Sequence, residues 1–344
     1  MPPTAEADAP KRKSWRRRLR WPVSLLAMLV VLEVLAGQFV ARPNRILRPS
    51  RDPELIYEST PGTWLGHAKA DVWRAPLYVV LDLIHLGDPT RPVASPPPPG
   101  YTLYRIDQAG CRAPSTGPIP ETSEVVVLGS SQGFGMLVPA EDTVSAMLQT
   151  QLRARGFAGI SVGNCGVIGQ HIVQTFRTAE LVRPVKQPRL MVMLVRPWHL
   201  TEQFDYTRVL VPRSRVWKWL IDRSNLARLM FYVHNRERGA SPPVPRAQLT
   251  AKIDQYLRNM RASNVRSLFF LLDDATPGCE AFPDLMAQLR ERGVPVERIW
   301  TPRGPNSYFV DRDRHWSRRG AELTTSEMID AVERELRVVR AAAP

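Results

Sequence analysis

The segment VVVLGSSQGFG occupies residues 125–135 and is the most informative part of the sequence. Its apolar run, Val125–Leu128, has the length and the β-branched composition of a strand buried on both faces. Gly129 and Gly133 flank Ser131 directly after that run, which predicts a tight turn with an exposed serine hydroxyl. We therefore expect a sheet that is covered on both sides, with a serine at the end of one strand.

Short apolar runs alternate with amphipathic stretches of helical length through residues 121–340, which we predict to be one domain. This alternation indicates an α/β fold, a doubly wound parallel sheet between two layers of helices. The predicted strands lie at 125–128, 160–162, 190–195, 267–272 and 294–300, and the predicted helices at 143–155, 170–183, 246–262, 281–292 and 317–337. Residues 42–120 are instead rich in Pro, Arg and Gly, which predicts a linker or an irregular covering layer.

The beginning of the chain predicts a membrane anchor. Residues 1–20 hold seven Lys and Arg residues, whereas residues 21–41 contain no Lys, Arg or Asp. At about 1.5 Å per residue, a helix over residues 21–41 matches the ~30 Å hydrocarbon layer of a bilayer. Because basic residues stay on the cytoplasmic side, we expect a single-pass signal-anchor helix in a bacterial cytoplasmic membrane, with everything after residue 42 outside the cytoplasm.

Two features of this segment leave alternatives open. Val34 and Ala36, before Gly37, fit the small-residue pattern at which a secretory signal is cleaved. Glu33 is unfavourable inside a membrane, and it would need either a proton or a polar partner on another helix.

The formal net charge of +14 raises the question of nucleic-acid binding. The sequence has no basic stripe with interleaved aromatic residues and no known reader motif, so we expect the basic tail to meet anionic lipid and not nucleic acid. The three cysteines, Cys111, Cys165 and Cys279, include no CxxC motif and no Cys/His pair at zinc spacing, so no metal site is predicted. One pair could form a disulfide outside the cytoplasm, but the spacing does not choose the pair.

Ser131 is the candidate nucleophile, and its surroundings also fit other kinds of turn. The pattern Gly129-x-Ser131-x-Gly133 matches the nucleophile elbow of α/β-hydrolases, but those enzymes have several strands before the serine. A phosphate-binding loop would need the Walker lysine or GxGxxG spacing, and the sequence has neither. A purely structural Gly/Ser turn remains the alternative.

Asp313 and His315 lie two residues apart, just before the last amphipathic stretch. A serine becomes a good nucleophile when a base takes its proton, and the base needs an acceptor that holds its tautomer. His315 would be that base and Asp313 its orienting partner. The alternative is a surface loop of solvated charges, since Arg312 and Arg314 are adjacent.

The serine after the first strand and the Asp-x-His before the last helix together resemble the SGNH/GDSL hydrolase superfamily over roughly residues 124–337. Gly129-Ser130-Ser131 is similar to the first block of that family, Asn164-Cys165-Gly166 to the second, and Asp313-x-His315-Trp316 to the last. The resemblance implies a flavodoxin-like three-layer fold. It also implies an oxyanion hole made by the amides of Ser131 and Gly166. The Asp-x-His-Trp form is similar to proteins of exopolysaccharide O-acetylation.

The chain departs from the family pattern at two places. Ser130 replaces an Asp, which removes hydrogen bonds of the turn but no proton-transfer group. The third block should supply an Asn to the oxyanion hole, and this chain instead has Arg196-Pro197-Trp198-His199. Trp198 or His199 could donate in its place, or both could simply pack beneath the loop.

The resemblance implies an ester hydrolase or an O-acyl transferase without a cofactor, acting on an acyl ester or a glycan of the bacterial envelope. The missing Asn supports one alternative, a catalytically degenerate scaffold that binds other envelope proteins. The arginines between Arg208 and Arg238 suggest another, in which the same fold binds an anionic glycan; a solvated helical insertion would also explain them.

Overall fold

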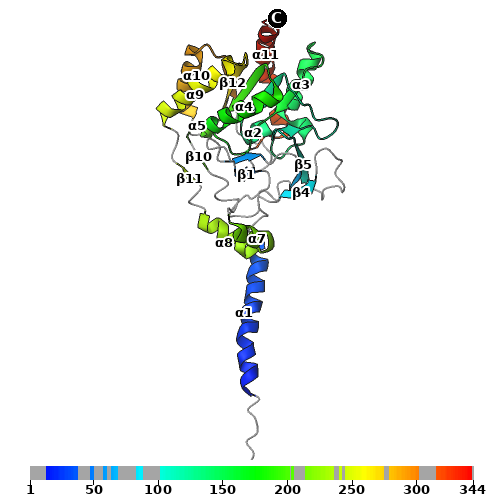
Figure 1. The fold of residues 1–344 in the computed structure, drawn as a ribbon, viewed down its shortest axis with the longest axis vertical. Helices are drawn as coiled ribbons and strands as arrows, with labels where there is room; N and C mark the ends of the chain where they lie inside the picture. The colour runs from blue at the N-terminus through cyan, green and yellow to red at the C-terminus, as the bar shows by residue number, and fades with distance from the viewer. Residues whose placement is uncertain are drawn as a thin grey trace, which may run out of the picture.

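The computed structural model describes residues 13–37, 47–49, 57–59, 63–68, 83–87, 101–201, 203–204, 214–235, 240–241, 245–274, 279–301 and 315–342 (Figure 1). Their helices are α1 (Lys13–Gly37), α2 (Ser131–Phe134), α3 (Val144–Ala154), α4 (Ile172–Lys186), α5 (Trp198–Thr201), α7 (Arg215–Arg223), α8 (Asn225–Asn235), α9 (Arg246–Arg261), α10 (Phe282–Glu291) and α11 (Arg318–Ala341), with short 3-10 turns η2 (Ala140–Asp142) and η4 (Cys279–Ala281). Their strands are β1 (Leu47–Pro49), β2 (Tyr57–Ser59), β3 (Thr63–Ala68), β4 (Leu83–Gly87), β5 (Tyr101–Ile106), β6 (Arg112–Ala113), β7 (Val125–Leu128), β8 (Val162–Asn164), β9 (Leu190–Val195), β10 (Gln203–Phe204), β11 (Ala240–Ser241), β12 (Arg266–Asp273) and β13 (Val296–Trp300).

A mostly parallel sheet forms the centre of the molecule and confirms the predicted α/β fold. Five strands run parallel in the order β13-β12-β9-β7-β8, which by sequence is 5-4-3-1-2. This is the flavodoxin-like order, in which the chain winds outward in both directions from the first strand. The order reverses between β7 and β9, and ligands of doubly wound sheets bind in the crevice outside that point. Ser131 lies three residues after the end of β7.

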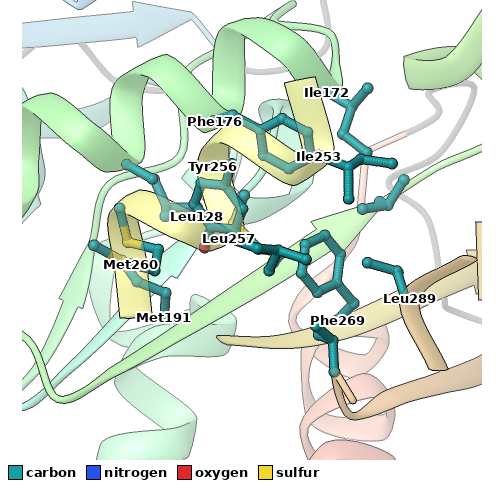
Figure 2. Close-up of a cluster of buried hydrophobic side chains, with 14 of the residues drawn as sticks. Leu128, Ile172, Phe176, Met191, Ile253, Tyr256, Leu257, Met260, Phe269 and Leu289 are labelled. Carbon is teal, nitrogen blue, oxygen red and sulfur yellow. The ribbon is translucent and has the colours of Figure 1, made fainter. Parts of the chain in front are cut away.

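Two hydrophobic clusters cover the two faces of the sheet. The apolar side chains of β7 and β9 alternate, so that Val126, Leu128, Met191 and Met193 belong to the cluster beneath α4, α9 and α10. Figure 2 shows this cluster, in which the rings of Phe176 and Tyr256 stack with their centroids 4.6 Å apart. The Tyr256 hydroxyl lies 2.9 Å from that of Ser267, so its polar tip is satisfied inside the core.

The opposite face of the sheet packs against α3 and α11. Val125, Val127, Leu190 and Val192 point toward this side, where they meet Leu148 of α3 and Met328 and Val332 of α11, among other residues. Each helix contributes apolar positions spaced three or four residues apart, as expected for an amphipathic helix on a sheet. The two clusters and the sheet between them are the three layers that the alternating sequence predicts.

The covering layer predicted for residues 42–120 contains strands, and the prediction of an irregular segment is wrong for these residues. Among the described residues, β6, β5, β3 and β4 continue the sheet beyond β8 in antiparallel pairs, which makes it nine-stranded and mixed. The junction is the pair Arg112 and Asn164. The strands are short and interrupted by Gly and His, so their alternation of apolar and polar residues is weak in the sequence.

The anchor predicted over residues 21–41 differs from the described helix. Helix α1 ends at Gly37, residues 38–41 lie outside the described residues, and no helix of the described part is long and apolar enough to cross a membrane.

Candidate functional site

Ser131 is the first residue of α2, at the carboxyl end of β7. It is buried, and its hydroxyl donates to the side-chain carbonyl of Gln132 at 3.3 Å. The turn before it requires a glycine, because Gly129 has a φ of +152° and a Cβ there would lie 3.0 Å from the carbonyl oxygen of Leu194. The sequence therefore places the serine at the carboxyl end of β7, where the strand order reverses between β7 and β9.

The loop after β8 runs directly beside the turn that carries Ser131. The amide of Cys165 donates to the Val127 carbonyl and that of Val167 to the Gly129 carbonyl, each at 2.9 Å. Gly166 lies between these two bonds, and a Cβ on it would be 2.3 Å from the backbone nitrogen of Phe134. The structure thus brings Ser131 and Gly166, the two predicted oxyanion donors, onto backbone segments in direct contact.

The amide of Gly166 has a partner in this structure. It donates to the Asn164 side-chain carbonyl at 3.3 Å, and the Asn164 amide group donates in turn to the carbonyl of Phe134 at 3.2 Å. A bond of 3.3 Å is longer than the usual 2.9–3.0 Å, so an oxyanion could replace Asn164 as the acceptor at small cost.

Arg112 holds the segment that follows the serine, and sequence analysis gave it no role. Its buried guanidinium donates to the carbonyls of Phe134 at 3.0 Å, of Gly135, and of Val138 at 2.6 Å. Burial lowers the pKa of Arg112 to about 10. Tyr104 of strand β5 also holds this segment, since its hydroxyl accepts a hydrogen bond from the amide of Leu137 at 2.9 Å. The upstream strands therefore fix the shape of the loop behind Ser131.

A disulfide joins Cys111 to Cys165, and Cys279 is not part of a disulfide. Cys111 precedes Arg112 at the start of β6, and Cys165 lies between Asn164 and Gly166. The bridge therefore ties the upstream strands to the loop that carries a predicted oxyanion donor.

Removing this bridge is expected to lower the free energy of unfolding by about 2–4 kcal/mol, because the two half-cystines are 54 residues apart and the bridge restricts the unfolded chain. Urea unfolding of Cys111→Ser/Cys165→Ser measures the loss. Dithiothreitol should destabilise the native protein and leave this double variant unchanged, with Cys279→Ser as the matched control. Equal stability of the native and double-variant proteins would contradict the expectation.

His315 lies three residues before α11 begins at Arg318 and is half-buried. The following Trp316 is buried in the core, and Ser317 caps the helix by accepting from the amide of Gly320 at 3.1 Å. Arg318, one residue further, lies 3.6 Å from the carboxylate of Asp142, which is on the segment after Ser131. The start of α11 is therefore beside the segment that follows the candidate nucleophile. Asp313 lies outside the described residues.

The loop after β9 carries the residues found where the family has its Asn. Arg196 is buried and forms an ion pair with the buried Asp274 at the end of β12. The backbone amide of Arg196 donates to Nδ1 of His199 at 3.0 Å, and burial together with the positive charge of Arg196 holds the pKa of His199 well below its usual value. His199 is thus neutral with its proton on Nε2, and this nitrogen has no hydrogen-bond partner within the described structure.

His171 is a second buried histidine of this edge, at the start of α4. Burial lowers the pKa of His171 to about 4. A positive charge on His171 would also disfavour protonation of His199. Sequence analysis missed His171, Arg196 and Asp274 as members of one polar group. The only sequence signal for them is their position, because each follows a predicted strand or begins a predicted helix.

We expect His171 to make the protein less stable in acid. In the unfolded chain its pKa is ~6.5, so between pH 6.5 and 4 the unfolded state binds a proton that the folded state does not. The contribution of neutral His171 to the free energy of unfolding is fully present above pH 6.5 and falls as the pH falls. About 3 kcal/mol of stability is lost at pH 4. His171→Asn should make the unfolding free energy, measured in urea, less steep between these pH values. The exposed His234→Asn is the control, and equal slopes for native protein and His171→Asn would contradict the assignment.

Comparison with known proteins gives matches among solved structures. No protein-family model matches the chain, and no curated protein sequence matches it. The chain is similar to the psychrotrophic esterase EstA from Pseudoalteromonas sp., with 11% identity over 63% of this chain and 100% of that one and a TM-score of 0.39. It is similar to a family two carbohydrate esterase from Cellvibrio japonicus, with 10% identity over 81% and 83% of the chains and a TM-score of 0.40. It is also similar to AlinE4, an SGNH-hydrolase family esterase, with 15% identity over 63% and 98% and a TM-score of 0.35.

Proposed function

We propose that this protein is a serine ester hydrolase or acyl transferase in which Ser131 is the nucleophile, His315 the general acid and base, and Asp313 the residue that orients His315. The observation that carries the proposal is the placement of Ser131 on a glycine turn at the switch point of the sheet, in backbone contact with the Gly166 loop. The start of α11, beside the segment after Ser131, supports His315 as its partner.

The reaction needs two acyl transfers. His315 takes the proton of the Ser131 hydroxyl while the serine oxygen bonds to the acyl carbon, and the same proton then passes to the departing alcohol. Water or a second alcohol next gives its proton to His315 while its oxygen bonds to the acyl carbon. The bond between the acyl carbon and the Ser131 oxygen then breaks, and His315 returns the proton to that oxygen, which restores the free hydroxyl. The amides of Ser131 and Gly166 stabilise the negative oxygen that forms in each transfer.

We propose His199 over Trp198 as the third donor to this oxygen, because His199 is neutral and carries a proton on a nitrogen without a described partner. His199→Phe should lower kcat for ester hydrolysis roughly 10²–10³-fold, the usual effect of losing one oxyanion donor. Trp198→Phe, which keeps an aromatic ring but lacks the indole donor, should leave kcat unchanged. The reverse pattern would assign the role to Trp198, and two unchanged variants would exclude both.

The proposed substrate is an O-acyl group, in particular O-acetyl, on an envelope or secreted polysaccharide. The support is the resemblance of Asp313-x-His315-Trp316 to proteins of polysaccharide O-acetylation. The proposed location is the outer side of the bacterial cytoplasmic membrane, with α1 as the anchor. The disulfide between Cys111 and Cys165 supports an oxidising compartment, and the exposed apolar side chains of α1 support contact with lipid.

A fluorophosphonate probe on the full-length protein tests the proposal, since it bonds to activated serines. Peptide mass spectrometry should find the adduct on Ser131 in the native protein and none in Ser131→Ala or His315→Ala. A folded native protein without an adduct would instead favour the scaffold alternative, a degenerate site that binds other envelope proteins.

A further inference from the structure

Helices α7 and α8 form a hairpin that packs on the end of α1. In Figure 1 the hairpin lies between α1 and the α/β domain. The rings of Trp217 and Phe231 meet between the two helices with centroids 5.7 Å apart, and Ile221 is buried there. The buried Arg228 also joins them, because it donates to the Ile221 carbonyl and, at 2.7 Å, to the Asn225 side chain. The hairpin is therefore a small packed unit.

Glu33 attaches this hairpin to α1. Its carboxylate accepts from the Ser224 hydroxyl at 2.7 Å, from the amide of Asn225, and from the amide of Leu226 at 3.1 Å. A carboxylate in this position caps the unpaired amides at the start of α8. Of the two sequence-based explanations for Glu33, the polar partner on another helix is the one observed. A charged residue in an apolar helix thus fixes the hairpin at one height along α1.

Among its described residues, the hairpin exposes four large apolar side chains, which are Val216 and Trp219 of α7 and Met230 and Val233 of α8, and we call these its apolar surface. These four side chains are between 55% and 66% exposed, and within each helix they are three residues apart on one face. Arg223 lies over the ring of Trp219 at 4.9 Å. An apolar face that includes a tryptophan and adjoins basic residues is characteristic of helices that lie in the headgroup region of a bilayer.

Helix α1 supports lipid as the occupant of this surface. The successive residues Met28–Leu32 are all apolar and none is buried, so α1 presents apolar side chains around its whole circumference. A protein partner would cover one side of such a helix, whereas acyl chains surround it. The hairpin adjoins this helix through the contacts of Glu33 with Ser224 and Leu226, at the junction of α7 and α8.

We propose that the α7–α8 hairpin lies on a lipid bilayer, with Val216, Trp219, Met230 and Val233 inserted among the lipids and Arg215 and Arg223 at anionic headgroups. The proposal rests on α1 as membrane anchor and extends it. The hairpin then fixes the height and tilt of the α/β domain, and with it the distance from the membrane to Ser131. A substrate would be a glycan within reach of that surface.

Site-directed fluorescence tests the proposal on the full-length protein in vesicles of phosphatidylcholine and phosphatidylglycerol. Cys279→Ser removes the thiol that is outside the disulfide, and a single cysteine introduced at Met230, Val233, Leu29 or Glu291 then carries an environment-sensitive nitrobenzoxadiazole label. Labels at Met230 and Val233 should brighten several-fold, shift to the blue and be quenched by lipids brominated near the headgroup. The label at Leu29 should respond to bromine deeper in the chains, and that at Glu291, on an exposed side chain of α10, should not respond.

Three results would overturn the proposal. Quenching at Leu29 without quenching at Met230 and Val233 would place α1 in the bilayer and the hairpin outside it. A blue shift at Met230 and Val233 without quenching would mean that protein covers this surface. No quenching at Leu29 would overturn the anchoring itself. None of these results depends on Ser131, so the fluorophosphonate test of the catalytic proposal is separate.

Discussion

Replacing His315 with alanine is expected to lower kcat/KM for a simple ester such as 4-nitrophenyl acetate by roughly 10³-fold or more. Without the imidazole, the Ser131 hydroxyl keeps its proton and the leaving alcohol receives none, and such general acid and base catalysis contributes about 10²–10⁴ in rate. A nucleophile and its base act as a unit, so the loss in Ser131→Ala should be as large. Steady-state hydrolysis rates of the purified full-length variants measure both losses.

The double variant Ser131→Ala/His315→Ala makes this prediction specific. If the two residues act in one step, the double variant should be no slower than either single variant. His234→Ala is the matched control, because His234 is exposed on α8 and has no role in the proposed reaction. A His315→Ala variant within five-fold of the native rate, about 1 kcal/mol, would remove His315 from the mechanism.

The parallel part of the fold could be predicted because its strands are buried on both faces. The predicted strand 190–195 is β9, and the predicted helices 246–262 and 281–292 correspond to α9 and α10 within one residue at each end. Helix α4 continues to Lys186, three residues beyond the predicted end at 183, although Pro184 lies inside it. Since Pro184 lies in the last turn, it removes one hydrogen bond near the helix end and does not break the helix.

The positions of Ser131 and Gly166 could also be predicted, because each directly follows a strand and strand order determines which loops meet. The supporting contacts could not, because they join residues far apart in sequence. Arg112 holds carbonyls 22, 23 and 26 residues away, and Arg196 pairs with Asp274 across 78 residues. Single residues of this kind leave no periodic signal. A long polar side chain in a Pro-rich segment has the same sequence context whether it is solvated or buried.

Replacing Gly166 with alanine is expected to have the second largest effect. The added Cβ would lie 2.3 Å from the Phe134 nitrogen and 2.6 Å from the Gly133 carbonyl carbon, so one of two backbone segments must move. Such overpacking costs about 1–3 kcal/mol of stability. Movement of either segment also separates the Gly166 amide from Ser131, and losing that oxyanion donor should lower kcat about 10²–10³-fold. Urea unfolding and ester hydrolysis measure the two effects.

Gly159→Ala separates the loss of stability from the loss of activity. Gly159 has a φ of +78°, which alanine adopts at a cost of about 1–2 kcal/mol, but no atom lies within 4 Å of the position of its Cβ. We therefore expect Gly159→Ala to be less stable while it reacts with the fluorophosphonate at the native rate, and Gly166→Ala to be both less stable and much slower. If the two alanine variants react equally fast, the Gly166 amide has no part in stabilising the oxyanion, because the backbone contact would then serve only the packing of the two loops.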